Sequence, residues 1–128
     1  MQGVRSYPAD SAVLSETRSF LRSLAAEAGF SNRTTEEVLL AVMEAANNAI
    51  EHSGSTEWRL SWRAFNSCLE FEVQDDGQFK QPLPLPEDAA ARGRGLLLMM
   101  ALMDSVSVRR GTAGDPGSAV RLMKCDHP

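Results

Sequence analysis

The spacing of apolar residues changes partway along this chain, and that change constrains the fold more than any other feature. In the stretches 11–28 and 34–50, apolar residues recur at the spacing of amphipathic helices. The runs Trp58–Arg63 and Leu69–Val73 instead alternate apolar with polar residues, which is the pattern of half-buried strands. The Asn66-Ser67 pair between them is typical of a turn. Two helices followed by an antiparallel hairpin are therefore predicted.

The rest of the chain continues the alternation of helix and strand. A short apolar helix is predicted at about 95–102, followed by strands at 105–109 and 119–124. A further short strand fits the residues ahead of the first helix. Helices and antiparallel strands that segregate in this way predict an α+β fold, a two-layer sandwich. A chain of 128 residues suits one domain.

Local signals mark the ends of the two long helices. Gly29 is predicted to stop the first helix, because glycine adopts the left-handed conformation that follows many helix C-termini. The second helix is predicted to begin with a capping box, Thr34-x-x-Glu37. Its end is expected at Ser53-Gly54.

The charge and the cysteines narrow the class of function. A net charge of −4 and a pI of about 5.1 argue against direct nucleic-acid binding. The longest apolar run, Leu96–Met103, is too short to span a membrane, and the first residues lack the apolar core of a signal peptide. Cys68 and Cys125 have no metal-ligand spacing, so we expect reduced thiols in a cytoplasmic protein.

Polar residues interrupt the second helix in the segment EAANNAIEH, residues 44–52. Glu44, Asn48 and His52 recur every four residues and so form one stripe on the helix, separate from its apolar face. A carboxylate can act as a general base, and an amide oxygen can bind Mg²⁺. The alternative is a solvated helix face, and Asn47, outside the stripe, is assigned to that face.

A carboxylate also follows the second strand of the hairpin, in the segment VQDDGQF. Asp75 lies where the strand ends, and Gly77 would let the backbone approach a flat ligand. A routine turn is the alternative reading of this segment. Similarly, Gly117-Ser118 could bring a hydroxyl towards a ligand just before the last strand, or form an ordinary turn.

The segment ARGRGLLLM opens the short apolar helix. Gly93 and Gly95 precede this helix, and a helix N-terminus favours anions through its free N–H groups and its dipole. Arg92 and Arg94 add positive charge. A flexible loop that enters a helix would have the same composition.

The order of these motifs resembles a known superfamily. Glu-x-x-x-Asn, Asp-x-Gly, Gly-x-Gly and Gly-Ser resemble the N, G1, G2 and G3 boxes of the GHKL ATPases, which include gyrase, heat-shock chaperones, histidine kinases and MutL. The phrases EAANNAIEH and GRGLLLMMALMDSV are similar to bacterial anti-sigma-factor serine kinases. The resemblance covers about Ser11 to Lys124. It implies one histidine-kinase-like ATPase domain over residues 1–128, with its core at about 11–124. The implied fold is a Bergerat α/β sandwich with helices on one face of the sheet, which holds Mg-ATP under a short lid.

The resemblance also implies roles for single residues. Asp75 would accept the adenine amino hydrogen, with Gly77 beneath the ring, and Ser118 would support the adenine. Asn48 would coordinate Mg²⁺, and Glu44 would be the base for the incoming hydroxyl. His52 matches a family position without a role that we can assign.

The phosphate-binding segment implied by the resemblance consists of Arg92, Gly93, Arg94, Gly95 and Leu96. Gly93 and Gly95 would bind phosphates through their backbone N–H groups. The family places a catalytic arginine near this box, and the choice between Arg92 and Arg94 stays open.

The family typically phosphorylates a serine of a STAS-domain anti-anti-sigma protein and otherwise sequesters a sigma factor. The resemblance therefore implies ATP and Mg²⁺ as cofactors, these two proteins as partners, no nucleic-acid or membrane partner, and a homodimer. Phe79 departs from the family pattern, because it occupies the position of the second glycine in the G1 box. It favours an alternative, a nucleotide-binding regulatory module without kinase activity. A histidine-kinase catalytic fragment is disfavoured by the short lid and by the lack of a dimerisation helix.

Overall fold

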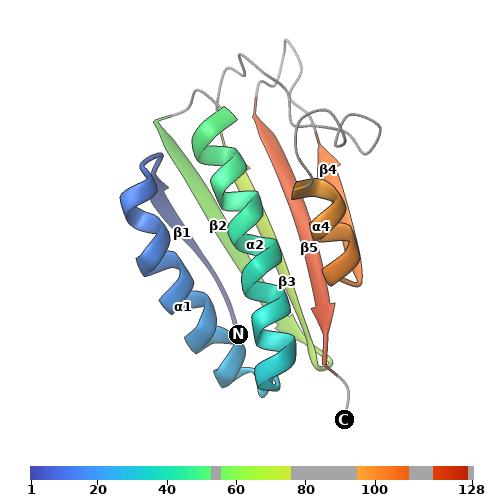
Figure 1. The fold of residues 1–128 in the computed structure, drawn as a ribbon. Coiled ribbons are helices and arrows are strands. Elements are labelled where there is room, and N and C mark those ends of the chain that lie inside the picture. Colours follow the sequence, from blue (N-terminus) through green and yellow to red (C-terminus); the bar gives the residue numbers. More distant parts are fainter. Residues whose placement is uncertain (53–55, 76–94, 110–116, 127–128) are drawn as a thin grey trace.

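One antiparallel sheet carries the helices α1, α2 and α4 on a single face (Figure 1). The computed structural model describes residues 1–52, 56–75, 95–109 and 117–126. Its elements in chain order are β1 (Gln2–Pro8), the 3₁₀-helix η1 (Ser11–Val13), α1 (Leu14–Glu27), α2 (Asn32–His52), β2 (Glu57–Phe65), β3 (Cys68–Asp75), α4 (Gly95–Leu102), β4 (Ser105–Arg109) and β5 (Ser118–Cys125). The predicted α+β two-layer sandwich is confirmed.

The strands of the sheet lie in the order β1-β2-β3-β5-β4, and every neighbouring pair is antiparallel. The extra strand ahead of the first helix is present as β1, on the outer side of β2. The predicted hairpin is β2–β3, and its turn has φ values of 47° at Asn66 and 66° at Ser67. Positive φ at both turn residues is the geometry whose twist matches that of the flanking strands.

The end of α1 is fixed by backbone hydrogen bonds around Gly29. Gly29 has φ +85°, its N–H donates to the Ala26 carbonyl, and the Phe30 N–H donates to the Ala25 carbonyl. These two bonds form a Schellman motif, which satisfies carbonyls that the helix end leaves free. The prediction that Gly29 stops this helix is confirmed.

The predicted start of α2 is wrong by one turn. The helix begins at Asn32, and Ser31 is its N-cap: the Thr34 N–H donates to Ser31 Oγ at 3.2 Å, and the Thr35 N–H donates to the Ser31 carbonyl at 2.9 Å. Thr34 thus lies inside the first turn, where its hydroxyl accepts a hydrogen bond from Ser31 Oγ. Ser and Thr are both good N-caps, so the local pattern did not separate the two positions.

The core lies between the sheet and the helices. The largest fully buried side chains of the sheet come from β2, β3 and β5: Trp58, Leu60, Leu69, Phe71 and Leu122. Helix α2 packs between α1 and α4 and presents alanines and valines to this layer. Each large apolar side chain buried here contributes about 1.5–3 kcal/mol to folding. Because these residues are small, α2 packs close to β2, β3 and β5.

The expectation of reduced cysteines is wrong for this structure. Cys68 and Cys125 lie directly opposite each other in β3 and β5, with Cα atoms 3.9 Å apart, and form a disulfide. A sequence separation of 57 residues hid the pairing, which depends on the register of two strands that are distant along the chain. The disulfide joins the start of β3 to the end of β5. Asp75 and Ser118 lie at the other ends of these two strands.

Candidate functional site

The polar stripe of α2 lies on the C-terminal half of that helix, beside the start of α4 (Figure 1). Glu44 and Asn48 are one helical turn apart, and both are half-buried. This intermediate burial contradicts the reading of the stripe as a fully solvated face. Because residues four apart on a helix are neighbours, the carboxylate and the amide can act on one bound group. The side chain of His52, the third member of the stripe, lies outside the described part of the structure.

The Glu44 carboxylate lies against the first residue of α4. A Cβ atom placed on Gly95 would be 2.9 Å from both Cγ and Cδ of Glu44, and closer still to Oε1. Among the described residues, Gly29 is the one glycine with a positive φ, so the backbone conformation at Gly95 does not itself require glycine. The missing side chain is what lets the carboxylate lie at the positive end of the α4 dipole.

Asp75 and Ser118 form a second group at the same end of the sandwich. They are direct partners in the β3–β5 register, and their exposed fractions are 3% and 2%. Buried carboxylates and hydroxyls rarely lack a partner, and each of these two residues has a polar or electrostatic interaction. The register brings Asp75, the first residue of the Asp-x-Gly motif, beside Ser118 of the Gly-Ser motif.

Two buried polar atoms lie in the same cross-strand row. Tyr7 pairs with Trp58, and Trp58 pairs with Asp75. The Tyr7 and Trp58 rings stack with centroids 4.8 Å apart. Within the described structure, Tyr7 Oη and Trp58 Nε1 have no hydrogen-bond partner, although both residues are at least nine-tenths buried. In the row that ends in Asp75 and Ser118, the Tyr7 hydroxyl and the Trp58 N–H can therefore still form hydrogen bonds.

We expect Tyr7→Phe to raise the free energy of unfolding by about 1 kcal/mol in the absence of ligands. A buried hydroxyl without a partner costs about 1–3 kcal/mol in lost hydration, and phenylalanine keeps the ring that stacks on Trp58. Urea denaturation followed by circular dichroism measures the change. A loss of stability would show that the hydroxyl has a partner.

The remaining site residues of the sequence analysis fall outside the described structure. These are Gly77, Phe79, Arg92, Gly93 and Arg94. Leu96, the second residue of α4, is described and is buried at 6% exposure. The structure thus brings Glu44 to the start of α4 and Asp75 to Ser118. Asp75 is the last residue of β3 and Ser118 the first residue of β5, whereas Glu44 and Gly95 lie where α2 meets the start of α4.

A groove of about 290 Å³ lies among the helices and includes Glu44 in its lining. Its lining residues come from α1, α2 and α4: Leu14, Arg18, Arg22, Glu36, Leu39, Leu40, Met43, Glu44, Asn47 and Leu98. An ion pair between Arg22 and Glu36 crosses it. Asn47 is half-buried and lines this groove. The sequence missed this groove because its walls come from separate helices.

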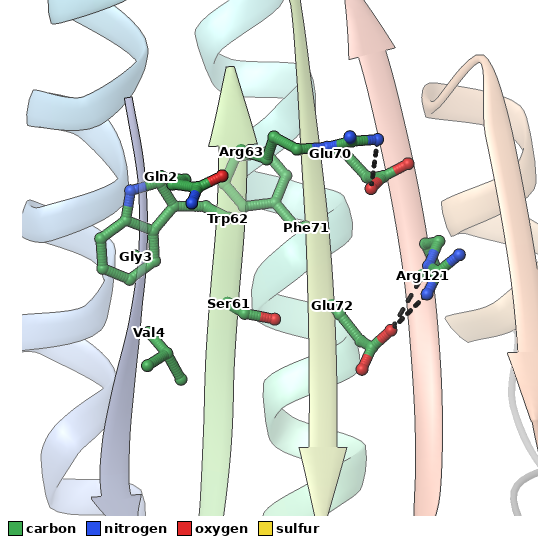
Figure 2. A pocket seen from close by; sticks show the side chains of 10 residues that line it. All are labelled: Gln2, Gly3, Val4, Ser61, Trp62, Arg63, Glu70, Phe71, Glu72 and Arg121. Atoms are coloured by element: carbon green, nitrogen blue, oxygen red, sulfur yellow. Dashed lines mark hydrogen bonds and ion pairs between the residues drawn. The ribbon is translucent and has the colours of Figure 1, made fainter. Parts of the chain in front are cut away.

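A larger hollow, of about 460 Å³, lies on the opposite face of the sheet (Figure 2). Ion pairs join Arg63 to Glu70 at 3.2 Å and Arg121 to Glu72 at 2.9 Å across its floor. The hydrogen bonds that Arg121 donates to Glu72, and then the charges of Glu72 and Glu70, raise the pKa of Arg121 above its ordinary value. None of the candidate site residues lines this hollow. This hollow is therefore separate from the candidate site formed by Glu44, Gly95, Asp75 and Ser118.

Two properties of residues 1–52, 56–75, 95–109 and 117–126 bear on membranes and metals. No helix in these ranges is long and apolar enough to cross a membrane. The same residues contain no group of three or more His, Cys, Asp or Glu side chains arranged to hold a metal ion. A magnesium ion bound mainly by phosphate oxygens, water and one amide needs no such group.

Comparison with known proteins identifies the family. The model of a histidine kinase-like ATPase domain matches residues 7–124. The serine-protein kinases RsbW of Listeria innocua serovar 6a and Listeria monocytogenes serotype 4a are both 31% identical to this chain, over 79% of its length and 74% of theirs.

Solved structures share the fold at lower identity. The crystal structure of the RsbU and RsbW domains of Rv1364c from Mycobacterium tuberculosis matches with a TM-score of 0.76 and 19% identity, over 98% of this chain and 32% of that one. A chain of the SiaB-SiaC complex from Pseudomonas aeruginosa matches with a TM-score of 0.66 and 9% identity, over 95% of this chain and 88% of that one. The chain belongs to the histidine kinase-like ATPase family of the GHKL superfamily, and within it to the anti-sigma-factor serine-protein kinases.

Proposed function

We propose that this protein is a Mg-ATP-dependent protein-serine kinase and anti-sigma factor. It phosphorylates a STAS-domain anti-anti-sigma protein and binds a sigma factor in a partner-switching system. The observation that carries the kinase assignment is the position of the Glu44 carboxylate against the first residue of α4. A base at a helix N-terminus lies where the phosphates of a nucleotide bind, and so where a hydroxyl must be deprotonated.

The described residues fit a nucleotide at this end of the sandwich. Asp75 and Ser118 are buried and adjacent, as recognition of one flat base requires. The spare hydrogen-bonding capacity of Tyr7 and Trp58 lies in the same row. The free N–H groups at the start of α4 favour an anion. These features support ATP as the cofactor.

Each residue then has one task. Bound Mg-ATP supplies the phosphoryl group. Asp75 accepts the adenine amino hydrogen, and Ser118 supports the ring through its hydroxyl. Asn48 gives its amide oxygen to Mg²⁺, a cation that prefers oxygen ligands. Glu44 accepts the proton of the attacking serine hydroxyl.

The rest of the cofactor site is assigned by sequence position alone. By the resemblance, Gly77 would lie beneath the ring, Gly93 and Gly95 would bind phosphates through backbone N–H groups, and Leu96 belongs to the same cofactor-binding segment. Either Arg92 or Arg94 stabilises the charge that develops during transfer. These assignments extend the proposal to the part of the chain between β3 and α4.

The groove beside Glu44 supports a protein as the phosphoryl acceptor. Leu40 and Leu98 line it with exposed fractions of 56% and 39%, and Arg18 adds a positive charge. Exposed apolar side chains next to a catalytic group suit a protein surface better than a small polar acceptor. An acceptor bound in this groove would reach the Glu44 carboxylate directly.

Intact mass spectrometry tests the proposal. The protein is incubated with Mg-ATP and, in turn, with each purified STAS-domain protein encoded in the source genome. We expect one of them to gain a single phosphate group on serine. Omission of magnesium is the control, and it should abolish the gain. If nucleotide binds but no acceptor gains phosphate, the kinase proposal fails.

A nucleotide-binding regulatory module is the second candidate. Phe79 favours it, because the family has a glycine at that position and glycine gives the lid hinge its freedom. Such a module would bind Mg-ADP and a sigma factor but leave every STAS protein unmodified. The same mass measurement therefore separates the two candidates.

The proposal extends to the setting of the protein. We place a single ATPase domain over residues 1–128 in the cytoplasm, with no direct nucleic-acid or membrane partner. A homodimer is the proposed assembly. Size-exclusion chromatography with light scattering should give twice the chain mass of 14.0 kDa.

A further inference from the structure

We infer that Gly95 is the positioning residue for Glu44: the space left by its missing side chain holds the carboxylate where the acceptor hydroxyl must arrive. This inference rests on the proposed function, in which Glu44 is the base. The assignment of Gly95 to phosphate binding concerns its N–H group. The new role concerns its missing Cβ atom, which a different experiment can test.

The contact between the two residues involves the whole outer half of the Glu44 side chain. Cγ, Cδ and Oε1 of Glu44 would each lie within 2.9 Å of a Cβ on Gly95. Side chains do not pack at such distances, so any residue larger than glycine would displace the carboxylate. A small rotation of the carboxylate alone would not relieve the contact with Cγ.

The surrounding packing decides which partner would move. Leu96 and Met99 anchor α4 in the core with exposed fractions of 6% and 1%. On α2, Ala45 and Ala46 next to Glu44 are almost fully buried. Neither helix can shift without opening the core, whereas the Glu44 side chain is half-buried and flexible. The carboxylate would therefore move, and the fold would stay intact.

Backbone conformation does not explain the glycine. Gly95 is the first residue of α4 and has no left-handed φ, so alanine would suit the helix. Alanine would also keep the N–H group that a phosphate needs. Among these explanations, the contact with Glu44 is the one that requires a residue without a side chain.

Variants that enlarge residue 95 and shorten the side chain of residue 44 test the inference. We expect Gly95→Ala to fold with unchanged thermal stability but to transfer phosphate at least about tenfold more slowly, because the base is displaced. Glu44→Asp, whose side chain is one methylene shorter, should also slow transfer. The double variant Gly95→Ala/Glu44→Asp should be faster than Gly95→Ala alone. If the two effects simply multiply, the residues do not share one space and the inference is wrong.

A measurement on the free protein checks the contact without using activity. The Gly95 amide signal in a ¹⁵N–¹H spectrum should shift in Glu44→Gln, because the adjacent carboxylate is replaced by an amide of the same shape. Glu36→Gln, a change at the other carboxylate of the groove, should leave this signal in place. In the Gly95→Ala background, Glu44→Gln should shift the residue-95 amide less. If the Gly95 amide signal is the same in the wild-type protein and in Glu44→Gln, the inference is wrong.

Gly29→Ala is the matched control. A Cβ on Gly29 would meet no atom within 4 Å, but the φ of +85° there strains any other residue. This variant should lose stability and keep its transfer rate, the opposite of Gly95→Ala. If wild-type protein phosphorylates no acceptor, the proposed function fails, and the amide spectra of the Glu44 and Gly95 variants still decide whether Gly95 positions Glu44.

Discussion

Replacement of Glu44 by glutamine is expected to slow phosphoryl transfer to the STAS-domain acceptor by about 10²–10⁴-fold, the usual contribution of a positioned base. Glutamine has the same shape and keeps the contact with Gly95, but its amide cannot accept the hydroxyl proton. Nucleotide affinity should be retained or increased, because the substitution removes a negative charge from the helix end that binds phosphates. Single-turnover mass spectrometry measures transfer, and calorimetry with Mg-ADP measures affinity.

Glu37→Gln is the matched control for this variant. Glu37 lies on the same helix, and its carboxylate is 3.7 Å from Lys124 Nζ, which donates to the Leu102 carbonyl at the end of α4 opposite to Gly95. Its replacement should leave the transfer rate unchanged. If Glu44→Gln also transfers phosphate at the wild-type rate, Glu44 is not the base and the kinase assignment loses the observation that carries it.

Replacement of Asp75 by asparagine is expected to weaken Mg-ADP binding by about 10- to 150-fold. A hydrogen bond to a charged acceptor contributes about 1.5–3 kcal/mol, which corresponds to that range of affinity. The loss should be large because Asp75 is 3% exposed, so water cannot replace the carboxylate as the adenine acceptor. Calorimetry with Mg-ADP measures the change, and thermal unfolding without nucleotide separates it from any loss of stability.

Asp104→Asn is the control for Asp75→Asn. The Asp104 carboxylate accepts a hydrogen bond from the Cys125 N–H at 2.7 Å, at the disulfide end of the sheet. Its replacement should leave Mg-ADP affinity unchanged. Equal affinities for wild-type and both variants would show that the purine is recognised elsewhere.

Features fixed by neighbouring residues could be predicted from the sequence. The Gly29 stop, the Asn66-Ser67 turn and the helix Gly95–Leu102 all depend on local conformational preferences and apolar spacing, and the structure confirms each of them. The start of α2 was missed by one turn, because Ser31 and Thr34 are both acceptable caps. Which one caps the helix depends on how the chain enters it from Phe30, a buried core residue.

Features made by distant segments could not be predicted in the same way. Cys68 meets Cys125 through strand register, and the groove that includes Asn47 forms where α1, α2 and α4 converge. The motif order indicated that Glu44, Asp75, Gly95 and Ser118 belong together. It did not show that the Glu44 side chain occupies the space of a Gly95 side chain.

The sequence by itself determined the elements, their α+β class and the candidate residues, because apolar period, turn chemistry and motif spacing are properties of short segments. Only the tertiary structure decided which side chains touch. A contact such as that of Glu44 with Gly95 depends on the packing of α2 against α4, and that packing is set by the buried residues of the whole core.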